Sequence, residues 1–327
     1  MNYTKVILKP GKEESLKRFH PWVFSGAIHH FEKQPEEGDI IEVTDYKGNF
    51  IAIGHYQIGS IAVRILSFEQ EIIDKEFFKK RLQVAYNLRN SIGLNRGEQN
   101  NTYRLVHEYL IGGDAGNIAI ENGLKFHVDW LKGQKTGFFV DQRENRSLLE
   151  HYSKDRSVLN MFCYTGGFSF YAMRGGAKLV HSVDSSAKAI DLTCKNVELN
   201  FPGDRRHEAF AEDAFKYLDR MGDQYDLIIL DPPAFAKHKN VLHNALQGYR
   251  KLNAKAFEKI KPGGILFTFS CSQVVTKENF RLAVFSAAAQ SKRRVRILHQ
   301  LTQPADHPVN IYHPEGEYLK GLVLYVE

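Results

Sequence analysis

Two polar positions in the second half of the chain carry side chains that could perform covalent chemistry together. Asp231 follows the apolar run 227–230 and opens an Asp-Pro-Pro sequence, and Cys271 follows the apolar run 264–269 within Ser-Cys-Ser. A thiolate can add to an electrophilic carbon, and a carboxyl group can stabilise charge that develops on a nearby atom. We therefore treat Cys271 and Asp231 as the candidate catalytic pair. The alternative for Cys271 is a small buried thiol at the end of a strand.

This pair lies in a region where short apolar runs alternate with helical patterns. The predicted strands are 158–162, 179–183, 227–230 and 264–269, and the predicted helices are 168–174, 186–200 and 246–260. Such alternation predicts an α/β fold, a doubly wound and mostly parallel sheet with helices on both faces. Active sites of this fold lie beyond the carboxyl ends of the strands. Asp231 and Cys271 should therefore converge at one edge of the sheet.

A glycine-bearing turn at 160–168 follows the first of these strands and predicts a bound ligand. Glycine lets the main chain approach a ligand closely, although packing alone can also require a Gly-Gly pair. Asp184 ends the second strand about 20 residues later, where doubly wound folds bind ribose hydroxyls. Asp213 could accept a hydrogen bond from an adenine amino group, or it could cap a helix. Because neither the P-loop nor the dinucleotide glycine pattern is present, a nucleoside without a pyrophosphate fits best.

The first 72 residues follow a different pattern, in which short strands alternate with glycine turns. The predicted strands are 6–8, 39–43, 49–54 and 61–66. They predict a small β-barrel domain over 1–72. A linker region over 73–116 contains a helix at 74–92 with Asp74 as its N-cap. The third region, 117–327, opens with a hairpin at 118–130 that turns at Asn122-Gly123 and then contains the parallel sheet.

Composition and charge restrict the class of protein. The chain has 327 residues, a formal net charge of +6 and three cysteines, without the spacing of a zinc site or a disulfide framework. No apolar run approaches the roughly 20 residues that cross a bilayer, and residues 1–10 lack the features of a signal peptide. We therefore expect a cytoplasmic protein with reduced thiols, no membrane association, no metal and a mild preference for polyanions. Cys163 and Cys194 are interpreted as structural.

A series of further motifs occurs in order along nearly the whole chain. They lie at 9–11, 20–26, 135–143, 160–168, 231–235, 270–272, 305–308 and 314–321. Together they resemble the RlmI-like family of large-subunit ribosomal RNA cytosine-5 methyltransferases. The resemblance implies a class I methyltransferase domain, with a Rossmann-like sheet and an antiparallel edge strand, preceded by a PUA-like RNA-binding barrel. It also implies S-adenosyl-L-methionine as cofactor and RNA, large-subunit rRNA above all, as partner. A homodimer is compatible with it.

The resemblance also implies roles for individual residues. The implied cofactor-binding residues are Asp141, Arg143, Phe162, Tyr164, Thr165, Gly166, Gly167, Asp184, Ser185, Asp213, Ala214 and Asp231. The implied substrate-binding residues are Lys135, Pro232, Pro233, Phe235 and Lys237. Cys271 would add to carbon 6 of cytosine and make carbon 5 nucleophilic toward a sulfonium methyl group, while Asp231 would hydrogen-bond the ring nitrogen. Ala234 stands where many RNA cytosine methyltransferases have a second cysteine.

Other side chains near these motifs have two interpretations each. Tyr164, Phe138 and Phe235 could form a slot for an extruded base, or they could simply pack. The basic residues could contact phosphates or belong to a solvated face; they are Arg143, Arg146, Lys237, His238, Lys239, Arg250 and Lys251. The His20-Pro21-Trp22 segment could contact RNA or form part of the barrel core.

One departure from the family follows Arg104-Leu105-Val106. Family members carry a central α/β insert at this point, whereas few residues separate it from the hairpin here. The insert is mostly missing, so the target nucleotide and the target RNA are left open. Two other functions also stay open. One is methylation of a ring or amino nitrogen with Asp231 alone, and the other is RNA binding without catalysis.

Overall fold

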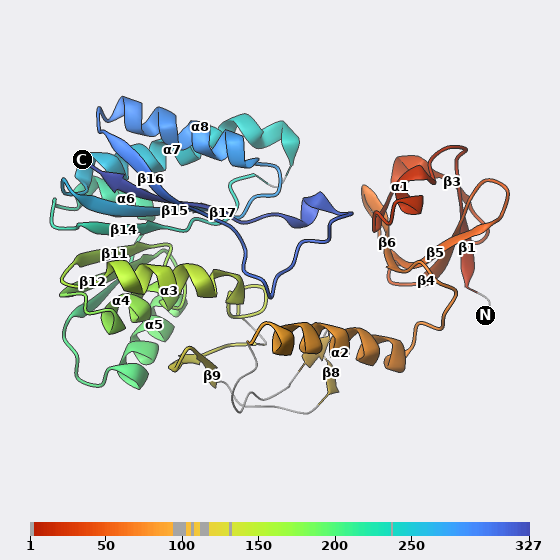
Figure 1. The fold of residues 1–327 in the computed structure, drawn as a ribbon, viewed down its shortest axis with the longest axis horizontal. Coiled ribbons are helices and arrows are strands. Elements are labelled where there is room, and N and C mark those ends of the chain that lie inside the picture. Colours follow the sequence, from red (N-terminus) through yellow and green to blue (C-terminus); the bar gives the residue numbers. More distant parts are fainter. Residues whose placement is uncertain (1–2, 94–102, 106–107, 112–117, 131–132, 237) are drawn as a thin grey trace. The chain divides into compact units, whose positions relative to one another are not determined.

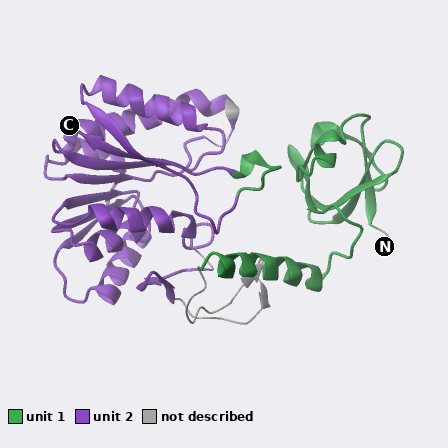
Figure 2. Ribbon diagram, in the orientation of Figure 1, with its two compact units in different colours: residues 1–113, 309–316 green, residues 114–308, 317–327 purple. Residues whose placement is uncertain are grey.

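The protein folds into two compact units (Figure 2). The structure is a computed structural model that describes residues 3–93, 103–105, 108–111, 118–130, 133–236 and 238–327. Unit 1 comprises Met1–Gly113 and Val309–Gly316, and unit 2 comprises Asp114–Pro308 and Glu317–Glu327. The sequence pattern assigns 309–316 to the C-terminal region, whereas the structure groups this short segment with the N-terminal unit.

Unit 1 is built on a six-stranded sheet with the order β2-β6-β5-β4-β1-β3. Its strands are β1 (Thr4–Leu8), β2 (Trp22–Phe24), β3 (Ile28–Phe31), β4 (Ile40–Thr44), β5 (Phe50–Tyr56) and β6 (Ile61–Ser67), with a short helix α1 (Glu14–Lys17). Only β1 and β4 pair in parallel. The sheet is curled around one apolar core that includes Val6, Ile41 and Val63 (Figure 1). The expected barrel is therefore present as a curled half-barrel.

The linker region begins with one long helix, α2 (Lys75–Ser91). The Asp74 carboxylate accepts a hydrogen bond from the Phe77 N–H at 2.9 Å, so the predicted N-cap is confirmed. Two short strands, β7 (Tyr103–Leu105) and β8 (Glu108–Ile111), form an antiparallel pair. Much of the stretch up to residue 117, including Val106 at the expected site of the missing insert, lies outside the described residues.

Unit 2 contains a seven-stranded sheet with the order β13-β12-β11-β14-β15-β17-β16. Its strands are β11 (Ser157–Met161), β12 (Leu179–Asp184), β13 (His207–Ala211), β14 (Leu227–Leu230), β15 (Gly264–Ser270), β16 (Val295–Leu301) and β17 (Lys320–Val326). β11 to β15 pair in parallel, and β17 pairs antiparallel with both β15 and the edge strand β16. The predicted doubly wound sheet, with antiparallel pairing at one edge, is thus confirmed.

Helices cover both faces of this sheet (Figure 1). They are α3 (Arg143–Tyr152), α4 (Gly167–Arg174), α5 (Ala187–Asn200), α6 (Ala214–Arg220), α7 (Leu242–Lys259) and α8 (Lys277–Gln290). One core cluster packs α6, α7 and α8 on one face, and a second packs α3, α4 and part of α5 on the other. The described residues contain no helix that is long and apolar enough to span a bilayer.

A β-hairpin precedes the parallel sheet, as the sequence predicts. β9 (Ile118–Glu121) and β10 (Leu124–His127) pair antiparallel, and both turn residues have positive φ, 49° for Asn122 and 82° for Gly123. This is the geometry that favours Asn-Gly in a two-residue hairpin loop. The main-chain N–H groups of Lys125 and His127 donate to Asn side chains of α5, so the hairpin is attached to that helix.

Candidate active site

The carboxyl ends of β14 and β15 bring the two candidate catalytic residues to one edge of the sheet. The strands are parallel neighbours, with Leu230 paired to Thr268, and Asp231 and Cys271 follow them directly. The Cys271 Sγ lies 4.0 Å from the carbonyl oxygen of Pro232. The structure therefore places both side chains at the same edge, although their catalytic roles stay predictions.

The main chain around Cys271 is anchored on both sides. The Ser270 hydroxyl donates to the hydroxyl of Tyr249 at 2.9 Å, and the Ser272 hydroxyl donates to a main-chain carbonyl of the loop after Asp-Pro-Pro at 2.5 Å. The ammonium group of Lys320, the first residue of β17, donates to the Ser272 carbonyl at 2.6 Å. Both serines are fully buried. Cys271 is consequently held between two fixed positions, and burial together with the Asp231 carboxylate raises its pKa.

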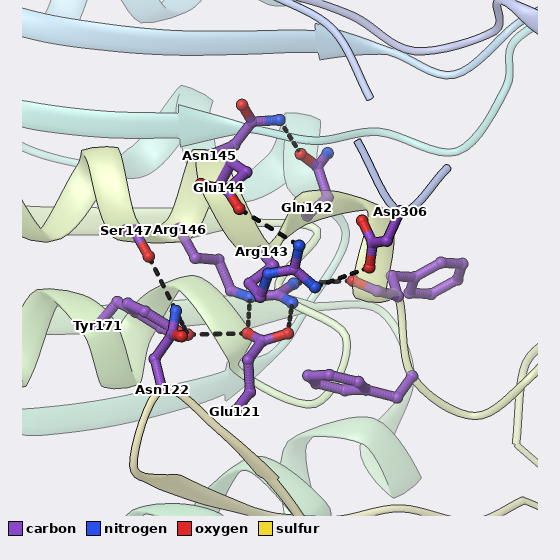
Figure 3. Close-up of polar contacts among 12 residues, drawn as sticks. Glu121, Asn122, Gln142, Arg143, Glu144, Asn145, Arg146, Ser147, Tyr171 and Asp306 are labelled. Atoms are coloured by element: carbon purple, nitrogen blue, oxygen red, sulfur yellow. Dashed lines mark hydrogen bonds and ion pairs between the residues drawn. The ribbon is translucent and has the colours of Figure 1, made fainter. Parts of the chain in front are cut away.

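Asp231 is held by a chain of two buried amides. The Gln142 Nε2 donates to the Asp231 Oδ2 at 3.0 Å. The Asn145 Nδ2 in turn donates to the Gln142 Oε1 at 2.6 Å (Figure 3). Burial and the nearby Asp141 carboxylate raise the pKa of Asp231 to about 7. A large share of the carboxyl groups therefore carries a proton at neutral pH. Such a group can donate a hydrogen bond to a substrate.

Asp141 lies in the short helix η2 (Val140–Gln142), which ends one residue before α3. The Tyr318 hydroxyl donates to its Oδ2 at 2.6 Å. Its other oxygen, Oδ1, is buried and has no hydrogen-bond partner among the described residues. A buried carboxylate oxygen without a donor is costly, so a ligand that carries a cation or an N–H group would satisfy it.

The glycine turn after β11 has a strained main chain. Phe162 has a φ of 59° and Tyr164 a φ of 48°, and Gly166 has a φ of 85°. A Cβ atom on Gly166 would lie 2.6 Å from the ring of Phe170, so packing requires this glycine. Asp184 at the end of β12 accepts hydrogen bonds from the N–H groups of Tyr164 and Ser186, each at 2.9 Å. This carboxylate therefore ties the turn to the sheet edge where a nucleoside is expected.

The remaining predicted cofactor residues occupy different environments. The Asp213 Oδ1 accepts from the Lys216 N–H at 3.0 Å and caps α6, so the capping interpretation is correct for this oxygen. Ser185 is exposed, whereas Thr165 and Ala214 are buried. A Cβ atom on Gly167 would lie 3.2 Å from the side chain of Arg146. None of these contacts tests a role in cofactor binding, which stays a prediction.

Two arginines of α3 are committed to ion pairs (Figure 3). The Arg143 guanidinium donates to the Asp306 Oδ2 at 2.7 Å, so it links α3 to the loop before β17. The Arg146 guanidinium donates to both oxygens of Glu121, at 2.8 and 2.7 Å, and is buried. The expectation that Arg146 meets phosphates or lies on a solvated face is therefore wrong, because its charge is used inside unit 2.

The predicted substrate residues that the structure describes lie in different environments. Pro232 is buried and Pro233 is exposed. The Phe235 ring packs on Tyr249 with 4.7 Å between centroids. The exposed Lys135 places its ammonium 5.5 Å from the centroid of the Phe139 ring. The remaining predicted substrate residue, Lys237, lies outside the described residues. Phe138, a candidate for the slot that holds an extruded base, packs in the core against Phe126.

One cluster in unit 1 has the composition of a metal site. His20, His313 and Glu315 place one ligand atom each within 4.8 Å of one another. However, the Trp22 N–H donates to the His20 Nδ1 at 3.3 Å, so the neutral ring carries its proton on Nε2 and donates it to Glu315 at 3.4 Å. A metal would need the lone pair of that Nε2. The cluster is therefore best described as a hydrogen-bonded contact, and the expected absence of a metal stays a prediction.

Several residues of the site escape the sequence analysis. Gln142, Tyr318 and Lys320 all lie within quoted motifs, yet no local pattern shows what they touch. Each meets a partner far away in the chain: Gln142 meets Asp231, and Tyr318 meets Asp141. Their position inside a motif is the one signal that could have identified them.

Comparisons with known proteins agree with this fold. Residues 100–314 match the model of the S-adenosylmethionine-dependent methyltransferase family, and residues 6–68 match that of the PUA-like domain. The ribosomal RNA large subunit methyltransferase I of Tolumonas auensis is 38% identical over 394 aligned positions, covering 98% of this chain and 99% of that protein. The protein of the same name from Shewanella denitrificans is 35% identical over 98% of this chain and 99% of its own. Because these alignments are longer than the 327 residues of this chain, the relatives carry additional residues, as the missing insert predicts.

Solved structures show the same architecture. A structure from Streptococcus mutans assigned as a SAM-dependent methyltransferase has a TM-score of 0.79 and 20% identity, covering 98% of this chain and 100% of that one. A methyltransferase structure complexed with SAH has the same TM-score at 21% identity, with the same coverage. S-adenosylmethionine is therefore the cofactor. The chain belongs to the S-adenosylmethionine-dependent methyltransferase family, in the group that contains the ribosomal RNA large subunit methyltransferase I proteins.

Proposed function

We propose that the chain methylates carbon 5 of a cytosine in large-subunit ribosomal RNA through a covalent adduct with Cys271. The observation that carries this proposal is the meeting of Cys271 and Asp231 at the adjacent ends of β15 and β14. The names of the relatives support the class of RNA. The PUA-like unit supports a nucleic acid as partner. The missing insert leaves the position of the cytosine to be determined.

The residues of unit 2 fit S-adenosylmethionine. The cofactor carries an ammonium group, and the buried Asp141 Oδ1 lacks a donor among the described residues. Asp184 stands at the end of β12, beside the glycine turn, where ribose hydroxyls are expected. When bound, the cofactor supplies an electrophilic methyl group on a positively charged sulfur.

Cys271 supplies the nucleophile. Carbon 5 of cytosine reacts poorly with an electrophile until a thiolate bonds to carbon 6. Formation of the bond from sulfur to carbon 6 moves the double-bond electrons to carbon 5, which can then bond to the methyl group. A base afterwards removes the carbon 5 proton, the electrons of that bond re-form the ring double bond, and the thiolate leaves. Ala234 stands where a second cysteine would assist release, so one cysteine completes the cycle.

Asp231 assists as an acid. Because the Gln142 amide donates to the Oδ2 of Asp231, the carboxyl proton is favoured on Oδ1. This oxygen can donate to the ring nitrogen that gains electron density when the thiolate adds. The pKa of about 7 keeps the proton available near neutral pH. The amide pair Gln142 and Asn145 therefore sets which oxygen faces the substrate.

Two variants and one substrate analogue test the proposal. Large-subunit RNA from cells that lack this protein is the substrate, and the methylated nucleotide is located by mass spectrometry. Cys271→Ala should lower turnover by about 10³-fold or more, because no other group replaces the nucleophile. Cys194→Ala on α5 is the matched control and should keep full activity. RNA that contains 5-azacytidine should form a stable covalent complex with the unaltered chain and with Cys194→Ala, but not with Cys271→Ala. Equal turnover in both variants would contradict the covalent mechanism and favour methylation of a base nitrogen that Asp231 orients.

A further inference from the structure

Lys320 is a buried cation beside the proposed nucleophile. It begins β17, pairs with Ser270 across the sheet, and is 5% exposed. Its ammonium donates to the Ser272 carbonyl at 2.6 Å. Lys320 therefore contacts both neighbours of Cys271: its side chain bonds to Ser272, and its main chain pairs with Ser270. No carboxylate among the described residues forms an ion pair with it within 4.0 Å.

A buried ammonium group without a carboxylate partner needs an explanation. Taking a charge out of water is costly unless an opposite charge or several hydrogen bonds compensate for it. A methionine or leucine at the start of β17 would fill the same space without that cost. An anion that forms beside Lys320 only during the reaction would explain why this position carries a buried ammonium group.

The charges around Cys271 show which anion this is. Asp231 and Asp141 both disfavour the thiolate, and the exposed Lys135 favours it. The titratable groups that act on Lys320 are Cys271, Glu317 and Lys277, and the last two form an ion pair with each other. Cys271 is thus the acidic group near Lys320 that lacks a cation of its own inside the protein.

We propose that Lys320 is the fixed positive charge that stabilises the thiolate of Cys271. This inference rests on the proposed function and adds a positioning residue to it. The sulfur–hydrogen bond breaks and the proton moves to solvent, which leaves a thiolate beside the Lys320 ammonium. Burial lowers the pKa of Lys320 to about 8, so most of the side chains still carry their charge at neutral pH. The hydrogen bond to Ser272 keeps the ammonium in place when the sulfur attacks.

The test measures the thiol directly and needs no RNA. Cys271 is alkylated with iodoacetamide at a series of pH values, in a chain that also carries Cys194→Ser, and its peptide is quantified by mass spectrometry. Lys320→Gln keeps a donor for the Ser272 carbonyl but removes the charge. The midpoint of Cys271 alkylation should rise by about one pH unit, which is a roughly tenfold slower reaction below the midpoint. Lys320→Arg keeps the charge and should stay close to the parent, and Lys277→Met, which removes a nearby exposed charge, should not move the midpoint.

The outcomes separate three ideas. If Lys320→Gln folds and alkylates like the parent, the residue acts only through its hydrogen bond and the inference is overturned. If neither Lys320→Gln nor Lys320→Met folds, the effect of Cys271 on Lys320 is measured instead. Cys271→Ala should lower the pKa of Lys320, which is read from its side-chain NMR shifts. An unchanged pKa would also overturn the inference. If the alkylation midpoints of the variants shift as expected but the protein does not methylate cytosine, the proposed function is wrong and the inference about Lys320 still holds. In the methylation assay with substrate RNA, Lys320→Gln should lower kcat and shift the pH profile of kcat to higher pH, while KM for RNA stays unchanged.

Discussion

The chemistry of Asp231 depends on its being difficult to ionise. Buried carboxyl groups that face another carboxylate bind protons more tightly, and here the pKa reaches about 7. The folded pKa is raised above the unfolded value, so above pH 7 the native state carries a buried charge that the unfolded state carries in water. The stability lost in this way should grow between about pH 4 and pH 7 and then remain constant.

Asp231→Asn should therefore stabilise the protein while it removes activity. The expected gain in the free energy of unfolding is roughly 1–3 kcal/mol at pH 8, less at pH 5, because the asparagine has no charge to bury. Urea unfolding at the two pH values measures the difference. Asp223→Asn, at an exposed position, is the control and should change little at either pH. A gain that does not depend on pH would contradict the raised pKa.

The role of Gln142 can be separated from that of Asp231. Replacing Gln142 with methionine removes the donor to Oδ2 but keeps a side chain of similar length, and a hydrogen bond to a charged group is worth roughly 1.5–3 kcal/mol. We expect kcat to fall about tenfold to a hundredfold, with KM for RNA unchanged, because the carboxyl group loses its orientation. The pKa of Asp231 should rise as well, since this donor lowers it. Steady-state kinetics across pH 6 to 9 provide the measurement, and Gln83→Met on the exposed face of α2 is the control.

The sequence identified residues by chemical type more readily than by contact. A carboxyl and a thiol at the ends of two predicted strands are visible without coordinates, since the carboxyl ends of parallel strands must meet. Gln142 and Tyr318 are different, because an amide and a phenol have no pattern that distinguishes a support from a surface group. Their partners lie 89 and 177 residues away along the chain. Only the packed fold shows such pairs.

At the scale of elements, the buried strands were the easiest to predict. β14 and β15 are fully buried, so their apolar runs stand out in the sequence. β16 has no fully buried position and contains Arg296, so it lacks such a run. α3 begins with the charged sequence Arg-Glu-Asn-Arg, and its Arg146 is buried by pairing rather than by apolarity. No range was predicted for β17 or α8 either, so polar contacts explain only some of the elements that the pattern misses.

The contact between the hairpin and α3 should be a strong stabilising element. Glu121→Gln leaves Arg146 buried without its counter-charge, and breaking a buried pair in this way costs roughly 3–5 kcal/mol. Urea unfolding should show that loss. Glu212→Gln breaks the more exposed pair with Arg220 and should cost far less, because water screens that pair. Equal costs for the two substitutions would show that Arg146 finds another partner when Glu121 is changed.

At the scale of the whole molecule, the two units have separate cores. The core of unit 1 is formed by its own sheet, and the two core clusters of unit 2 contain no residue of unit 1. Every predicted cofactor residue belongs to unit 2. Under the proposed function, the PUA-like unit would bind RNA, and the other unit would hold the cofactor and the reacting base.

This division predicts that the cofactor stabilises one unit only. The chain has two tryptophans, Trp22 in unit 1 and Trp130 in unit 2, so each unit has its own fluorescent reporter. A ligand at a hundred times its Kd adds about 2.7 kcal/mol to the unit that binds it. In the Trp22→Phe chain, saturating S-adenosylhomocysteine should raise the unfolding midpoint reported by Trp130. In the Trp130→Phe chain, the midpoint reported by Trp22 should stay where it is. Asp184→Asn should abolish the first shift, and equal shifts at both tryptophans would mean that the two units unfold as one.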